Sequence, residues 1–155
     1  MEYQNTLSSA IAFSQNGKLE EWIHLFLNAD ANNTAFSDGL KLFKRHYLGP
    51  IKMHVSSLKR CCGPESHMKW QVDREGFEKR VSSLQKSIES DHDMPPLIVQ
   101  YSQEGFELND GNHRYEAYVR SGYKEVDVII WMTEKSDYDS FLEKYSHYQD
   151  SIPIQ

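Results

Sequence analysis

The stretch of this sequence best suited to chemistry is 110–114, Asp-Gly-Asn-His-Arg. Apolar and polar residues alternate over 106–108, as in a strand, and the apolar residues of 115–119 have helical spacing. Gly111 has no Cβ, so the backbone can turn tightly there or approach a ligand closely. The first amides of the helix would lack intrahelical partners, and the helix dipole favours an anion beside them. The pattern predicts a strand, a turn and a helix that can bind a phosphate at its start.

The same residues also have a purely structural interpretation. Asp110 can be the N-cap of the helix, with His113 in solvent. Arg114 can form a surface ion pair with Glu107 or Glu116. Against this, side chains that carry positive charge in the first turn oppose the helix dipole, and an external phosphate would account for them. Spacing alone leaves both interpretations open.

Composition and charge narrow the class of protein. The chain has 155 residues, of which 39% are hydrophobic and 26% are charged, and its formal net charge is −6. This length suits one domain with a real core, and the negative charge argues against a general nucleic-acid binder. Cys61 and Cys62 are adjacent and cannot staple the fold, and no apolar run approaches the ~20 residues of a membrane span. We expect a cytoplasmic protein with no membrane partner.

Periodicity predicts a helical segment before Pro50 and a mixed α and β segment after it. The first helix is capped by Thr6, and the second carries the apolar stripe of 19–27. A third helix is expected to begin at Ser37 or Asp38 and to be stopped by Gly49-Pro50, with three residues facing inward: Leu40, Phe43 and Tyr47.

After Pro50, period-two patterns predict four strands of a small sheet: Ile51–Val55, Leu97–Tyr101, Phe106–Asn109 and Val126–Trp131. Asp73 is expected to cap a helix over 77–90, and a second helix over 113–121 is expected to pack with it on the sheet. Ser136 and Asp139 resemble a capping pair for a last helix.

Residues 56–72 show no clear period. Long irregular segments in compact domains are usually functional or disordered, and Trp70 and Leu58 argue against disorder here. The segment holds an unusual density of reactive side chains: Lys59, Arg60, Glu65, His67 and Lys69.

The sequence resembles the ParB/sulfiredoxin superfamily. Residues 110–117, followed by Gly122 and the strand 126–130, are similar to its phosphate-binding motif, in which a strand delivers a Gly-x-[His/Arg]-Arg loop into a helix. The similarity covers about residues 51–131, and its specific core is 111–117.

Upstream segments occur in the order of that superfamily: the loop 57–60, the helix near 77–90 and the strand 96–99. The resemblance implies an α+β fold, with a ParB/sulfiredoxin-like small mixed β-sheet, packed helices and an N-terminal helical extension. We expect one domain with three parts: the extension over 1–48, the core over 49–132, and a C-terminal helix and tail over 133–155.

The resemblance can be tested against three activities of the superfamily. Sulfiredoxins place their catalytic cysteine where this chain has Asn112, which cannot form a thiolate. Partition proteins carry a helix-turn-helix domain after the motif, but here 38 residues follow Ala117 and the net charge is negative. A nuclease would need a carboxylate–metal cluster, for which no strong spacing is present. All three activities are therefore disfavoured, and nucleic acid is not an expected partner.

The remaining precedent is a stand-alone nucleotide-binding domain such as the free serine kinases. Phosphoryl transfer relies on positioned anion donors and charge neutralisation. By resemblance, the amides of Gly111, Asn112 and His113 and the side chain of Arg114 would hold the phosphate. The expected ligands are ATP or another nucleotide and a small-molecule acceptor.

Four further residues receive roles from the same resemblance. Asp110 would hold Mg²⁺ or the acceptor hydroxyl, and Glu65 would be the general base. Lys59 and Arg60 would contact phosphate from the other side. Glu65 can equally be a surface carboxylate that follows Pro64.

A rival function is a non-catalytic nucleotide sensor. It would use the same phosphate loop, and its N-terminal helices would contact a protein partner. The sequence leaves enzyme and sensor open.

Overall fold

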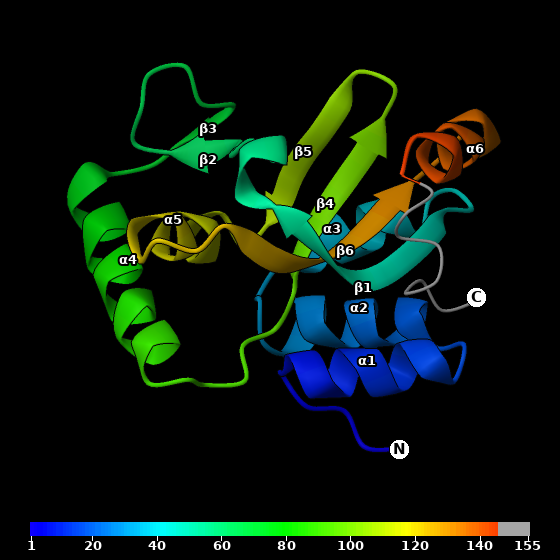
Figure 1. Ribbon diagram of the computed structural model, residues 1–155, viewed down its shortest axis with the longest axis horizontal. Helices are drawn as coiled ribbons and strands as arrows, with labels where there is room; N and C mark the ends of the chain where they lie inside the picture. The colour runs from blue at the N-terminus through cyan, green and yellow to red at the C-terminus, as the bar shows by residue number, and fades with distance from the viewer. Residues whose placement is uncertain (146–155) are drawn as a thin grey trace.

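The centre of the structure is a four-stranded mixed sheet of order β1–β6–β4–β5 (Figure 1). The computed structural model describes residues 1–145. β6 runs antiparallel to β1 and parallel to β4, while β4 and β5 form an antiparallel hairpin. The strands are β1 (His46–His54), β4 (Leu97–Ser102), β5 (Gly105–Asp110) and β6 (Glu125–Met132). The predicted α+β class and the four predicted strands are confirmed.

Helices surround this sheet. α1 and α2 lie below it in Figure 1, α3 lies behind the strands, α4 and α5 lie at one side, and α6 lies at the other. Their bounds are α1 (Leu7–Gln15), α2 (Leu19–Ala29), α3 (Thr34–Leu40), α4 (Arg74–Glu89), α5 (Asn112–Arg120) and α6 (Lys135–Lys144). The segment between β1 and α4 adds a 3₁₀ turn and a two-stranded parallel sheet: η1 (Val55–Ser57), β2 (Cys62–Gly63) and β3 (Trp70–Gln71). Within residues 1–145, no helix is long and apolar enough to cross a membrane.

Both faces of the sheet are covered because strands β4 and β6 carry apolar residues on both sides. On one face, Ile98 and Ile129 pack with the apolar stripes of α1 and α2. On the other face, Val99 and Ile130 pack with Phe141 of α6 and Leu58 of the irregular segment. The N-terminal helices are thus part of the same packed body as the sheet.

α4 packs against α5 rather than directly on the sheet. The prediction that both helices pack on the sheet is therefore wrong for α4. Its apolar residues recur at steps of four, three and four and meet Ala117 of α5. Asp73 caps α4 as predicted, through a bond from the Gly76 amide at 2.8 Å. In Figure 1, α5 accordingly lies between α4 and the strands.

The third helix begins earlier than the sequence predicted. Its N-cap is Asn33, whose side chain accepts a hydrogen bond from the Phe36 amide at 3.3 Å. Neither Ser37 nor Asp38 caps it, so that prediction is wrong. Ser37 is fully buried inside the helix, and its hydroxyl bonds to the ring of His24 at 2.7 Å.

The same helix also ends earlier than predicted. Arg45 folds back and donates to the carbonyl oxygens of Gly39 and Leu40, at 3.0 and 3.2 Å, which satisfies acceptors at the helix end. Phe43 is exposed rather than inward. Tyr47 is buried, but from strand β1.

Gly49 and Pro50 form a bulge in β1 and do not stop a helix, contrary to prediction. Pro50 is tolerated because β1 is an edge strand, where a missing amide need not break a ladder. Gly49 has a φ of 111°, and a Cβ there would lie 2.8 Å from the Val128 carbonyl oxygen. The Ser14 hydroxyl donates to the Gly49 carbonyl at 2.5 Å, so the bulge also anchors α1.

The two other predicted caps have different outcomes. Thr6 caps α1, and its side chain accepts from the Ser9 amide. Ser136 and Asp139 do not cap α6, whose N-cap is Glu134 without a side-chain bond. Asp139 pairs instead with Lys135 at 3.0 Å, because the helix begins one residue before the predicted cap.

Gly49→Ala should lower the free energy of unfolding by about 2–4 kcal/mol, because it combines a strained φ with a collision against backbone. Gly17→Ala is the matched control: φ is 71°, but nothing lies within 4 Å of its Cβ, so about 1 kcal/mol is expected. Urea denaturation measures both. If both variants lost the same free energy of unfolding, this would contradict the close approach of β1 to β6.

Candidate functional site

Gly111 makes the turn between β5 and α5. It is the N-cap of α5, with a φ of 96° in the left-handed region. A Cβ at this position would lie 2.5 Å from Leu97 Cδ2 and 2.9 Å from Arg114 Nη2. Glycine is required both by the backbone conformation and by the space. Asp110 is therefore not the N-cap, and the structural alternative built on it is wrong.

The start of α5 is open to an external acceptor. No side chain caps the helix, and within residues 1–145 no acceptor outside it pairs with the amides of 112–114. Orphan amides at a helix start, aligned with the dipole, are a common arrangement for binding anions. Two of the predicted donors, the amides of Asn112 and His113, are therefore open to an acceptor, and their binding of phosphate stays a prediction.

Two clefts flank this turn and share Asp110, Gly111 and His113. The first, here called the aromatic cleft, has a volume of about 610 Å³. Its remaining lining residues are Asn33, Ala35, Phe36, Cys61, Cys62, Lys69, Trp70, Glu107, Asn109 and Asn112.

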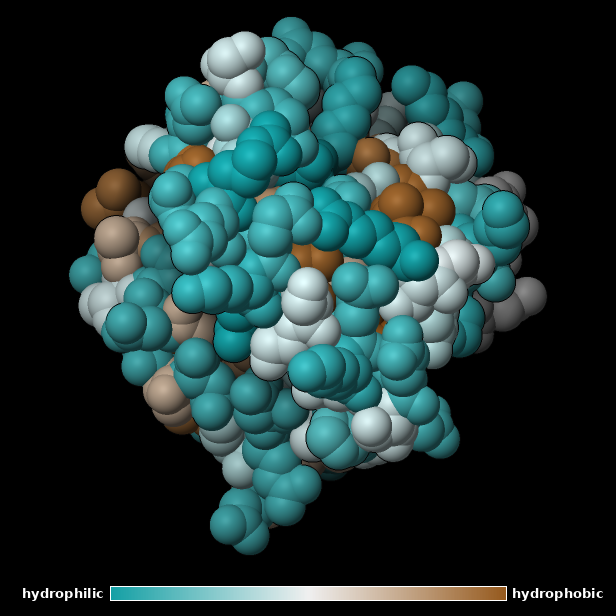
Figure 2. Space-filling model, turned by 90° about the vertical axis from the view of Figure 1, so that its left-hand side faces the viewer, coloured by the Kyte–Doolittle hydropathy of each residue, from teal (hydrophilic) through white to brown (hydrophobic). Residues whose placement is uncertain are grey.

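The second, here called the charged cleft, has a volume of about 430 Å³. Its remaining lining residues are Asn5, Phe26, Asp30, Ala31, Arg80, Leu84, His92, Asp93, Met94, Pro95 and Arg114. Figure 2 faces the side of the molecule that carries α4, and hydrophobic residues are confined there to small separate patches. That surface is typical of the surroundings of a polar ligand, not of a large hydrophobic interface.

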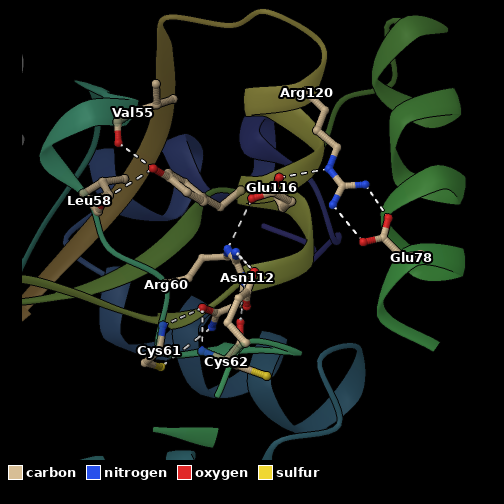
Figure 3. Close-up of polar contacts among 11 residues, drawn as sticks. Val55, Leu58, Arg60, Cys61, Cys62, Glu78, Asn112, Glu116 and Arg120 are labelled. Carbon is tan, nitrogen blue, oxygen red and sulfur yellow. Dashed lines mark hydrogen bonds and ion pairs between the residues drawn. The ribbon is translucent and has the colours of Figure 1, made fainter. Parts of the chain in front are cut away.

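Asn112 fastens the irregular segment to the turn (Figure 3). Its Oδ1 accepts from the amides of Cys61 and Cys62, at 2.9 and 3.2 Å. Its Nδ2 donates to the Leu108 carbonyl at 3.2 Å. The side chain is buried and occupied by these bonds, so only the Asn112 backbone amide is available to a ligand.

The two cysteines are held as thiols. Burial raises the pKa of Cys61 and of Cys62. The Cys61 Sγ also lies 2.9 Å from the Leu108 carbonyl oxygen. Neither side chain therefore has the low pKa of a reactive cysteine.

Arg60 lies at the centre of an ion-pair network (Figure 3). It holds both carboxylate oxygens of Glu65, at 2.6 and 3.1 Å, and its Nε lies 3.3 Å from Glu116. The guanidinium also lies 5.1 Å from the ring centre of Phe77 and is largely buried. Arg60 thus joins the irregular segment to α5 and has little freedom to bind a phosphate without exchanging partners.

The network continues from α5 to α4. Arg120 pairs with Glu116 at 2.9 Å and with Glu78 at 2.5 Å. The charges alternate from Glu65 to Glu78, so each guanidinium lies between two carboxylates. This arrangement sets the position of α4 relative to the α5 start.

Glu65 is a weakly basic carboxylate in this state. The Arg60 hydrogen bonds hold its pKa at about 2. It lines neither cleft. Action as a base would require the Arg60 pair to open, and the predicted catalytic role stays a prediction.

His113 contacts both clefts and stacks at 5.0 Å on Phe77. Burial lowers its pKa, and the positive charges of Arg80, Arg60 and Arg114 lower it further. Besides the effect of burial, the three guanidinium groups thus make the electrostatic potential at the start of α5 more positive.

Arg114 supports the turn from beneath. Its Nη2 donates to the Pro96 carbonyl at 3.1 Å, and the guanidinium lies 5.8 Å from the ring centre of Phe26. The Arg114 Nη2 lies 3.5 Å from the Asp110 Oδ2. The Asp110 Oδ2 and the Arg114 Nε are buried and have no hydrogen-bond partner within residues 1–145. The predicted pair of Arg114 with Glu107 or Glu116 is absent from the described residues, and Asp110 takes that place.

Asp110 alone is a poor site for a resident Mg²⁺. Burial raises its pKa despite Arg114, which disfavours the ionised form that a metal ligand needs. Within residues 1–145, no group of three or more His, Cys, Asp or Glu side chains is arranged to hold a metal ion. Mg²⁺ requires an octahedral shell of oxygens. The Asp110 assignments stay predictions.

The structure brings together some predicted site residues and separates others. Asp110, Gly111 and His113 meet at the junction of the clefts, but the exposed Lys59 lines neither one. Sequence reasoning missed several lining residues that come from distant elements: Asn33, Phe36, Lys69, Trp70, Arg80 and Asn109. Only Lys69 and Trp70 carried a signal, because they lie in the irregular segment 56–72.

One family model matches part of this chain. Residues 67–141 are similar to the ParB N-terminal domain. The match begins after the Lys59–Glu65 region and excludes the N-terminal helices. No curated protein matches the sequence.

Solved structures similar to this chain include a sulfiredoxin from Arabidopsis thaliana, with 20% identity and a TM-score of 0.43, covering 59% of this chain and 94% of that one. A ParB from Caulobacter crescentus complexed with CTP-gamma-S has 18% identity and a TM-score of 0.44, and the match covers 63% of this chain and 53% of that one. A free serine kinase in complex with AMP has 16% identity and a TM-score of 0.38, and the match covers 57% of this chain and 32% of that one.

The helices packed around a four-stranded mixed sheet, and the segment similar to the ParB N-terminal domain, agree with the predicted ParB/sulfiredoxin-like fold. The chain spans about half or less of the ParB and kinase structures. The expectation that nucleic acid is not a partner stays a prediction. The cytoplasmic location stays a prediction.

Asn112→Ala should destabilise the protein by about 1–3 kcal/mol, because the amides of Cys61 and Cys62 lose their side-chain acceptor and the Leu108 carbonyl loses one of its donors. Amide exchange at Cys61 and Cys62 should accelerate more than exchange elsewhere. Asn109→Ala is the control, because it removes a side-chain amide of the aromatic cleft that makes no hydrogen bond to Cys61 or Cys62. Unchanged exchange at Cys61 and Cys62 in Asn112→Ala would show that the fastening is weak.

Proposed function

We propose that this protein binds a nucleotide, with a phosphate at the first turn of α5. The observation that carries this proposal is the uncapped helix start behind Gly111, which opens between two clefts. Its amides supply donors without a side chain, as the glycine-led phosphate loops of other folds do.

The electrostatic environment supports the same ligand. Three arginines lower the pKa of His113, and the Arg80 among them is exposed in the charged cleft. An anion at the α5 start would lower that positive potential and accept from the orphan amides at the same time. Arg114 would contribute its charge from beneath the turn and keep Gly111 in place, because its guanidinium already bonds the Pro96 carbonyl.

Binding of tripolyphosphate or ATP should raise the pKa of His113 toward its ordinary value, because a nearby anion stabilises the imidazolium. Binding would then take up a proton, and affinity should increase as pH falls through the range where free His113 is neutral. NMR titration of the imidazole signals measures this. His113→Gln assigns the signal, and exposed His67 is the internal control. Binding that leaves the His113 signal in place would contradict the assigned phosphate position.

The finer proposal is phosphoryl transfer from ATP to a hydroxyl of a small molecule. The acceptor oxygen would form a bond to the γ-phosphorus while the bond to the ADP oxygen breaks, and the hydroxyl proton would pass to the Glu65 carboxylate. Asp110 would orient the acceptor. The support is the phosphate site together with the position of Glu65, which Arg60 joins to α5 through Glu116.

Glu65→Gln tests this role, because it keeps size and hydrogen bonding but removes the base. A catalytic Glu65 predicts that turnover falls by roughly 10²–10⁴ while ATP affinity is nearly unchanged. Glu104→Gln, in the exposed β4–β5 turn, is the matched control. Phosphate release and transfer to serine and other hydroxyl compounds are the measurements, and normal turnover in Glu65→Gln would remove Glu65 from the mechanism.

A non-catalytic nucleotide-binding module is the second candidate. One observation favours it: both Glu65 oxygens are bound by Arg60, which leaves this carboxylate weakly basic. In that case ATP binds, but neither its hydrolysis nor transfer to any hydroxyl acceptor is detected with the wild-type protein.

A further inference from the structure

Two aromatic side chains from distant parts of the chain line the aromatic cleft. Phe36 comes from α3, in the N-terminal segment outside the family match, and Trp70 comes from β3. The Trp70 side chain is 62% exposed, although its backbone is ordered by pairing with Cys62. An exposed indole at the edge of a cleft offers a flat apolar surface, and the only cation that the described residues place over it is Lys69, whose Nζ lies 6.0 Å from the ring centre.

Phe36 is held in place from behind. Its ring packs on Trp131 at 5.9 Å, and the Trp131 indole donates to Asn109 Oδ1 at 2.9 Å. Asn109 donates in turn to Glu107, which pairs with Lys69 at 3.4 Å. The cleft thus combines aromatic surfaces with an ordered polar lining.

One polar group beside Phe36 is available to a ligand. The Oδ1 of Asn33 accepts from the Phe36 amide, which fixes the orientation of its side chain. Its Nδ2 has no hydrogen-bond acceptor within residues 1–145, and Asn33 lines the cleft. A donor in this position can bond to the edge of a planar ring.

We propose that the aromatic cleft binds the base of the nucleotide, with Phe36 and Trp70 as stacking surfaces and Asn33 as a donor to the ring edge. This rests on the proposed function, since the cleft shares Asp110, Gly111 and His113 with the phosphate position at α5. Base–aromatic stacking is favourable for every base, and side-chain amides discriminate among their edges. The N-terminal segment would therefore determine the nucleotide preference of this protein.

The test compares ligands with and without a base. Wild-type protein should bind at least one of ATP, GTP, CTP and UTP more tightly than tripolyphosphate by calorimetry, and that nucleotide should quench tryptophan fluorescence. Trp70 is the responsive fluorophore, because Trp22 and Trp131 are 0% and 7% exposed. Phe36→Ala and Trp70→Ala should each weaken the nucleotide about 5- to 150-fold and leave tripolyphosphate within about twofold.

Two control variants sharpen the result. Trp70→Phe should restore most of the affinity without the quenching. Phe43→Ala removes an exposed phenylalanine outside both clefts and should leave the affinity for every ligand unchanged. Asn33→Ala should change the ranking of the four nucleotides, whereas a role limited to capping α3 would lower stability and keep the ranking.

The outcomes separate this proposal from the proposed function. Equal affinity for tripolyphosphate and all four nucleotides would overturn the base site and leave the phosphate site. Quenching of Trp70 by a nucleoside, without any tripolyphosphate binding, would overturn the phosphate site alone. Failure of every ligand to bind would overturn both.

Discussion

The candidate site depends on the hydrogen bonds of one buried side-chain amide, that of Asn112. Asn112 bonds the backbone of Cys61, Cys62 and Leu108, and these residues belong to the irregular segment and to β5. A side chain with both donors and acceptors is needed, because two amides and one carbonyl must be satisfied together. The bonds keep the irregular segment against the β5–α5 turn, and the aromatic cleft exists because that segment stays there.

The ion-pair network around Arg60 extends this constraint to α4 and also limits what the site can do. Arg60 has two carboxylate partners, so it holds the irregular segment and α5 together. The same bonds lower the basicity of Glu65 and leave Arg60 without a free face for phosphate. In an enzyme, a bound ligand would have to replace the Arg60–Glu65 ion pair so that Glu65 can act as a base. In a binding module this ion pair can stay intact.

The N-terminal helices have both a packing role and a place in the site. α1 and α2 cover one face of the sheet, and the β1 bulge bonds to α1 through Ser14. As a result, the ends of α2 and α3 reach the Gly111 turn, with Phe26 beside Arg114 and Phe36 in the aromatic cleft. A segment that lies outside the family match thus contributes walls to both clefts.

The sequence by itself determined the elements whose signals are local. Period-two runs identified the four strands, spacing of 3.6 residues identified α4 and α5, and Gly111 marked the turn because only glycine suits its conformation and space. Local signals were misleading at Gly49-Pro50, where an edge strand accommodates what usually ends a helix. They also missed the end of α3, which depends on Arg45 folding back.

Only the tertiary structure decided which side chains are free to act. Glu65, Arg60 and Asn112 are chemically suitable for a phosphate site, yet each is occupied by partners that no local pattern could indicate. Phe36 and Arg80 carry no signal in the sequence, and Trp70 carries only its place in the irregular segment. All three become cleft residues because the helices and the irregular segment pack around the α5 start. Residue type and spacing specify what a side chain can do, whereas burial and pairing, which depend on contacts between distant segments, specify whether it is available.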